Sequence, residues 1–224
     1  MEAMTFVGIP FYSLAKYRGM GSAVQSLRDA GIVQRLSSGN VQVRDIGDVE
    51  CPRIDSDHGP RNLRNYEEFI EGTRRVRDKL LKEADGSVLT FCLGVECTFI
   101  VGSVATLKKV YGGKPGIVWM DAHGDFNTPE TTPSGFIGGM CLALACGRGP
   151  RLSKDIKRTR PLLDEERESP HRVLSPRPAE HDDSGTWLKV AEGPFAGQYH
   201  RHLVFVAGFD ELRVFYRPAG LYYR

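Results

Sequence analysis

The chain has 224 residues, of which 30 are Lys or Arg and 28 are Asp or Glu, so its formal net charge is +2. This near balance argues against a nucleic-acid or anionic-membrane partner, because both require a broad cationic surface. No apolar run reaches the roughly 18 residues that could span a bilayer. The first residues also lack the basic and apolar regions of a signal peptide. The length suits a single domain over residues 1–224.

The chain has five cysteines. Their number is odd, and three of them lie inside apolar runs. Both features favour reduced thiols and a cytoplasmic location over a disulfide framework.

Apolar runs and amphipathic segments alternate along the first 150 residues. Ser22 and Gly31 are expected to begin and end the first helix. Continuous apolar strands separated by helices are typical of a parallel sheet covered on both faces. The sequence therefore predicts a three-layer α/β/α fold, with ligands bound at the carboxyl ends of the strands. Strands are predicted at 4–11, 41–49, 87–94 and 116–121, and helices at 19–32, 66–85, 98–112 and 138–147.

The pattern changes after about residue 150. Residues 4–150 form the predicted α/β core, whereas 151–201 fit it poorly. Within that part, 154–185 is rich in charge and proline and has little apolar periodicity, which is typical of a long surface loop or a disordered segment. A late strand is predicted at 202–209.

Residues 119–135, WMDAHGDFNTPETTPSG, contain the strongest chemical pattern. Asp121, His123 and Asp125 occupy alternate positions, which face one side of an extended chain. Two carboxylates and an imidazole suit Mn²⁺ or another first-row divalent ion. One ion could use all three groups, or two ions about 3.5–4 Å apart could share the carboxylates and hold a hydroxide. Alternatively, Asp121 caps the following turn and His123 is an ordinary surface residue.

Residues 119–140, WMDAHGDFNTPETTPSGFIGGM, resemble the second signature motif of the arginase–agmatinase (ureohydrolase) family. PLLDEER at 161–167 and AGLYYR at 219–224 are similar to later family segments. The resemblance covers most of residues 4–167 and then fails until the last few residues, so the C-terminal portion of the fold is expected to be incomplete. A reading-frame slip, a deletion, a mispredicted gene end or true divergence would each account for residues 168–215.

The resemblance implies an arginase-like α/β/α fold and two Mn²⁺ ions that hold an attacking hydroxide. The expected reaction releases urea from a small guanidino or amidino substrate such as arginine or agmatine, and the expected assembly is a homotrimer or homohexamer. By resemblance, Asp121, His123 and Asp125 are metal ligands, and Asp125 is also the candidate catalytic residue.

The resemblance also assigns Asn127, Thr132 and Ser134 to binding of the substrate's α-carboxylate, because hydroxyls and amides can donate hydrogen bonds to it. These residues are equally typical of capped turns, which is the alternative interpretation.

Three positions depart from the family pattern. The motif G-G-D-H-S corresponds to GVECT at 94–98, where Cys97 replaces a metal-binding histidine. A Cys97 ligand would favour Zn²⁺ or Fe²⁺ over Mn²⁺, and the alternative is a buried, inert thiol. Gly138 stands where the family has a histidine credited with proton transfer. Asp210 is a candidate ligand from the motif S-F-D-x-D, in which Leu212 replaces the second aspartate.

These observations leave three functions open. The first is an arginase-like metallohydrolase acting on C–N bonds other than peptide bonds. The second is a catalytically silent family member that binds a ligand or pairs with active subunits, which Cys97, Gly138 and Leu212 favour. The third is a metal-dependent deacetylase of related fold.

Overall fold

The computed structural model describes residues 2–37, 40–111, 123–152 and 161–163, and the single positions 117, 119, 121 and 156. Within these residues, no helix combines the length and apolar character needed to cross a membrane. Asp210 and the predicted strand at 202–209 lie outside the described residues, and so does most of the predicted strand at 116–121.

Three parallel strands form the described sheet, in the order β2-β1-β3. They are β1 (Glu2–Ile9), β2 (Val41–Asp48) and β3 (Leu89–Gly94). Phe6 of β1 is paired with Asp45 of β2 on one side and with Phe91 of β3 on the other. The middle strand is the most apolar, and its Phe6, Val7 and Ile9 side chains are fully buried. The predicted parallel sheet is confirmed.

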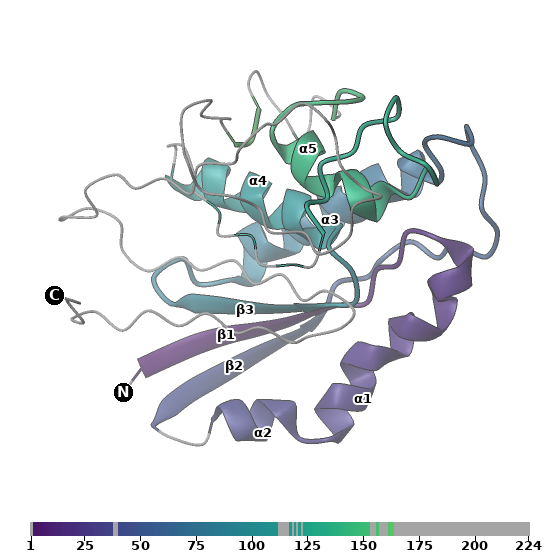
Figure 1. Ribbon diagram of the computed structural model, residues 1–224. Helices are drawn as coiled ribbons and strands as arrows, with labels where there is room; N and C mark the ends of the chain where they lie inside the picture. Colours follow the sequence, from purple (N-terminus) through teal and green to yellow (C-terminus); the bar gives the residue numbers. More distant parts are fainter. Residues whose placement is uncertain are drawn as a thin grey trace, which may run out of the picture.

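Helices cover both faces of this sheet (Figure 1). On one side lie α1 (Ala23–Asp29) and α2 (Ile32–Leu36), preceded by the 3₁₀ helix η1 (Ala15–Ser22). On the other side lie α3 (Tyr66–Glu83), α4 (Phe99–Tyr111) and α5 (Cys141–Ala145), the last preceded by the 3₁₀ helix η2 (Ile137–Met140). This arrangement confirms the predicted three-layer α/β/α architecture.

Helices α3 and α4 approach each other closely at Gly102. A Cβ atom at Gly102 would lie 2.7 Å from the carbonyl oxygen of Thr73 and 2.8 Å from Cβ of Val76. The buried face of α3 includes Phe69, Val76 and Leu80, as its helical spacing predicts. Close packing of this pair fixes the position of α4, which begins two residues after Cys97 of the candidate site.

Two predicted boundaries are wrong. The predicted helix at 19–32 is divided into the end of η1 and α1, and Gly31, with a φ of 83°, ends α1 as predicted and separates it from α2. Ser22 makes no side-chain capping hydrogen bond. Strand β1 ends at Ile9 rather than at residue 11, since the following Pro10 has no N–H to continue the ladder.

Strand β2 is not the continuous buried run that was expected. It lies at an edge of the described sheet, and its residues alternate between partly buried and exposed over most of its length. Arg28 of α1 holds this strand by two hydrogen bonds of 3.0 Å to the Asp45 carboxylate and a further contact with Asp48. An ion pair therefore joins α1 to β2, in addition to the apolar side chains of Val43 and Ile46 that pack against the core.

Candidate metal centre

Cys97 lies in the turn between β3 and α4, at the carboxyl end of the strand. A Cβ atom at Gly94 would meet the Phe99 ring at 2.3 Å, so glycine lets the chain fold back closely at this point. The Cys97 carbonyl accepts a hydrogen bond of 3.1 Å from the Ile100 N–H, in the first turn of α4. The thiol is nearly buried, with 9% of the residue exposed.

Asp121 supplies the second group of the site. Its Oδ2 accepts a hydrogen bond of 3.3 Å from the Cys97 thiol. Its Oδ1 accepts one of 3.0 Å from the His123 N–H, which is the turn-capping geometry considered as the alternative role. One carboxylate oxygen is therefore used by the local turn, while the other points to the thiol.

Asp125 supplies the third group, through a backbone conformation that the sequence did not reveal. Its φ is 46°, and its carbonyl accepts hydrogen bonds from the N–H groups of Leu142 and Ala143 at the start of α5. Asp121, His123 and Asp125 would face one side only if the chain were extended throughout, and Asp125 departs from that conformation where its carbonyl caps α5. The same departure brings its Oδ2 within 3.8 Å of the Cys141 thiol.

These side chains form a compact group of possible metal ligands. One ligand atom from each of Cys97, Asp121 and Asp125 lies within 4.8 Å of the other two. His123 does not belong to this group, although its Nδ1 lies 3.5 Å from Asp121 Oδ1. The structure therefore brings together the residue from the divergent first motif and the two aspartates of the second.

Burial of this group opposes negative charge. Removal from water, with a smaller contribution from the nearby Asp121 charge, raises the pKa of Asp125 to about 7, against a hydrogen bond from Cys97 that lowers it. Burial also raises the pKa values of the Cys97 and Cys141 thiols well above their usual range. A bound cation would reverse these preferences by stabilising the ionised carboxylates and a thiolate.

The donor atoms decide which ions fit. Two carboxylate oxygens and one sulfur in a partly buried group can hold one divalent ion. They do not fit the manganese pair expected from the family, because a thiol is a poor ligand for Mn²⁺ and three donors are too few for two ions. This holds for the described residues, which do not include Asp210.

The loop after Asp125 contains the three predicted substrate-binding residues. Asn127 Oδ1 accepts a hydrogen bond of 3.1 Å from the Thr131 hydroxyl. The hydroxyl oxygens of Thr132 and Ser134 accept hydrogen bonds from the N–H groups of Gly135 and Phe136. The oxygens therefore stabilise turns, while each hydroxyl hydrogen of Thr132 and Ser134 can still be donated.

A second segment, which sequence reasoning missed, holds this loop in place. The Asn62 amide donates a hydrogen bond of 2.8 Å to the Pro129 carbonyl, and the Arg64 N–H donates one of 3.2 Å to the Gly135 carbonyl. Gly135 has a φ of 70°, and a Cβ atom there would lie 2.0 Å from the carbonyl oxygen of Arg61. No sequence periodicity signals such a loop-to-loop contact.

Gly138 lies in η2, where the family motif has a histidine. A Cβ atom at this position would lie 2.3 Å from the Phe136 ring. That ring also packs edge-on against Tyr17 at a centroid distance of 5.6 Å. Phe136 thus occupies the space that a side chain at position 138 would need. In the observed packing, only glycine fits at position 138 without a shift of the Phe136 ring.

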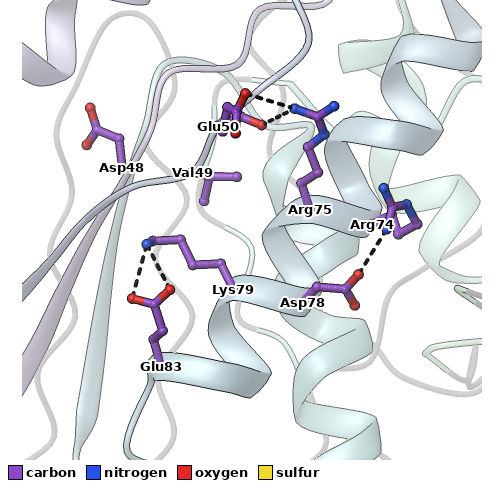
Figure 2. Close-up of a pocket in the computed structure, with 8 residues that line it drawn as sticks. All are labelled: Asp48, Val49, Glu50, Arg74, Arg75, Asp78, Lys79 and Glu83. Carbon is purple, nitrogen blue, oxygen red and sulfur yellow. Dashed lines mark hydrogen bonds and ion pairs between the residues drawn. The ribbon is translucent and has the colours of Figure 1, made fainter.

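An open surface hollow of about 500 Å³ lies between the end of β2 and α3 (Figure 2), and none of the candidate metal ligands lines it. Its basic side chains are already paired with acidic neighbours, so it offers no unpaired charge for a ligand among the residues that line it. The pairs are Arg75 with Glu50 at 3.9 Å, Arg74 with Asp78 at 3.3 Å and Lys79 with Glu83 at 3.2 Å.

Comparison with known proteins gives a consistent assignment. The arginase family model matches residues 2–159. Arginase from Staphylococcus aureus (strain COL) is 32% identical over 153 residues, which are 67% of this chain and 50% of the relative. Arginase from Bacillus caldovelox is 30% identical over 151 residues, or 66% of this chain and 50% of the relative.

Comparison with solved structures points to the same family. Arginase from Bacillus cereus superimposes with a TM-score of 0.64 at 28% identity, covering 74% of this chain and 54% of the other. Arginase from Entamoeba histolytica, solved in complex with L-ornithine, gives a TM-score of 0.57 at 29% identity and covers 70% and 54% of the two chains. The fold and the aspartate-bearing strand edge thus define an arginase-like α/β/α protein.

The chain belongs to the arginase family. It spans about half the length of the curated relatives that it matches. The match extends through the described core, and it includes Cys97, Asp121 and Asp125.

Proposed function

We propose that this protein is a metal-dependent hydrolase that cleaves a guanidino or amidino C–N bond and releases urea. The observation that carries the proposal is the convergence of Cys97, Asp121 and Asp125 at the carboxyl end of β3, in a chain of the arginase family. Ligands of open α/β sheets bind at this edge.

A divalent ion in this group would supply hydroxide near neutral pH by lowering the pKa of a coordinated water. Cys97 and Asp121 would hold the ion, and Asp121 is itself oriented by the His123 N–H. Asp125 is the proposed catalytic residue. A carboxylate oxygen that the ion does not use can accept a hydrogen bond from the attacking water and orient it.

We assign substrate binding to Asn127, Thr132 and Ser134. The hydroxyls of Thr132 and Ser134 can each donate a hydrogen bond to a carboxylate while their oxygens stay bonded to the backbone. The E. histolytica relative was solved with an amino acid, L-ornithine, which supports a substrate that carries an α-carboxylate. An arginine-like substrate is therefore preferred over agmatine, which has no such group.

A catalytically silent family member is the second candidate. Cys97 replaces a metal-binding histidine, and the Phe136 ring fills the space next to Gly138, where the family has its proton-transfer histidine. Such a protein would keep the fold and one ion, and would bind a ligand or an active subunit. The arginases reported above give no support to the deacetylase alternative.

The remaining expectations are proposals as well. We propose a single domain over residues 1–224 with its core at 4–150, a homotrimer or homohexamer, and a cytoplasmic location. The five cysteines are free, which supports a reducing compartment. Light scattering on the purified protein measures the assembly directly.

A urea assay tests the main proposal. Metal-free protein is loaded with Mn²⁺, Zn²⁺ or Fe²⁺ and incubated with arginine, agmatine and other guanidino compounds. The hydrolase is supported if the wild type releases urea from arginine and the Asp125→Asn variant does not. Bound metal without urea from any substrate supports the silent relative.

A further inference from the structure

We propose that this site is a zinc-type centre for a single ion, with the Cys97 thiolate as one of three protein ligands and an open fourth position. The inference rests on the metal-binding part of the proposed function, but it does not require urea formation. It departs from the manganese pair that the family implies.

The spacing of the donor atoms fits one tetrahedral ion. Zinc binds sulfur at about 2.3 Å and carboxylate oxygen at about 2.1 Å, so two such ligands at a tetrahedral angle lie about 3.6 Å apart. The observed separation of Cys97 Sγ and Asp121 Oδ2 is 3.3 Å. Asp125 completes the group, since the three ligand atoms all lie within 4.8 Å of one another.

The chemistry of sulfur then selects the ion. Thiolates favour zinc and other thiophilic ions, whereas Mn²⁺ favours oxygen and nitrogen. On coordination the Cys97 thiol loses its proton to solvent and the ion takes its place. With three protein ligands, the fourth tetrahedral position is left open to a water or a substrate.

Cys141 supports the centre without binding the ion. Its side chain is fully buried at the start of α5, and its Sγ lies 3.8 Å from Asp125 Oδ2. It does not belong to the group of mutually close ligand atoms. The contact therefore makes Cys141 a positioning residue that orients Asp125, as groups around metal ligands commonly do.

Cobalt absorption tests the assignment. The full-length protein is stripped with a chelator and titrated with Co²⁺, which produces a near-ultraviolet sulfur-to-cobalt band only when a thiolate binds the ion. We expect this band in the wild type, its loss in Cys97→Ser, and its retention in Cys141→Ser and in the buried control Cys146→Ser. Circular dichroism checks that each variant is folded.

A second variant changes the type of ligand atom at position 97. Cys97→His replaces sulfur by nitrogen, and we expect the affinity for Mn²⁺ relative to Zn²⁺ to rise by about tenfold or more. Competition between the two ions, followed by elemental analysis, measures this ratio. An unchanged ratio would overturn the proposal even if Cys97→Ser failed to fold.

The outcomes separate the two proposals. Cobalt bound without a sulfur band refutes the zinc-type centre but leaves a hydrolase with oxygen ligands. A band that Cys141→Ser also abolishes refutes the three-ligand assignment. A Cys97-dependent band without urea release supports the centre and refutes the hydrolase, and no bound ion at all refutes both.

Discussion

Replacing the buried Glu96 by glutamine should stabilise the protein at alkaline pH and not at acid pH. Only 2% of Glu96 is exposed. Its Oε1 accepts a hydrogen bond of 2.7 Å from the Thr98 hydroxyl, and hydrogen bonding to Ser13 also favours the ionised carboxylate. Burial raises the pKa of this carboxyl to about 7 from its ordinary value of 4.5.

The size and sign of the effect follow from linkage. Between pH 4.5 and pH 7 the unfolded chain has lost this proton while the folded protein retains it, so folding becomes less favourable as the pH rises. The contribution of Glu96 is fully present below pH 4.5 and is lost as the pH passes 7. A shift of about 2.5 units corresponds to at most about 3 kcal/mol. Glutamine does not ionise, and it keeps an oxygen for the Thr98 hydroxyl.

Denaturant unfolding of the metal-free protein measures this difference. The free energy of unfolding of Glu96→Gln, relative to the wild type, should rise by up to about 3 kcal/mol between pH 4.5 and pH 8. The pH dependence that Asp125 contributes is present in both proteins and cancels in the comparison. A difference that stays constant over this range would refute the assignment of Glu96 as a carboxyl that is protonated in the folded state.

Three further substitutions test the packing around the site. Gly135→Ala should destabilise the protein by about 2 kcal/mol or more, because alanine resists positive φ and its Cβ would clash with the neighbouring backbone; an unchanged melting temperature would contradict this contact. Gly138→His should lower the melting temperature, and adding Phe136→Ala should recover part of the loss; additive losses would disprove the proposed overlap. Arg28→Lys should cost up to about 1 kcal/mol, because lysine cannot replace a two-point hydrogen bond near the surface; wild-type stability on urea unfolding would show that the pairing is unimportant.

The arrangement of layers could be predicted from the sequence, because apolar strands and amphipathic helices have distinct periodicities. The buried run at 89–94 and the amphipathic helix at 66–83 were both predicted to within a few residues. The end of the first helix at Gly31 was predicted, whereas the 3₁₀ helix before it and the short α2 after Gly31 were missed. The burial of β2 was misjudged because this strand lies at an edge of the described sheet, where several of its side chains are exposed.

The candidate site was predictable in its residues but not in its geometry. The spacing of Asp121, His123 and Asp125 suggested an extended run that would bring all three together. Instead, Asp125 turns the chain while its carbonyl caps α5, and His123 stays outside the compact group. The contact with Cys141 depends on how α5 packs, which no local pattern encodes.

Metal content tests the central claim most directly. The protein and its Asp121→Ala variant are incubated with excess divalent metal, dialysed and analysed for metal and protein, with the exposed Asp55→Ala as control. We expect about one ion per chain in the wild type and in the control, and almost none in Asp121→Ala, because one of only three ligands is lost. Equal metal content in Asp121→Ala and the wild type, or no metal in any of the three, would contradict the account.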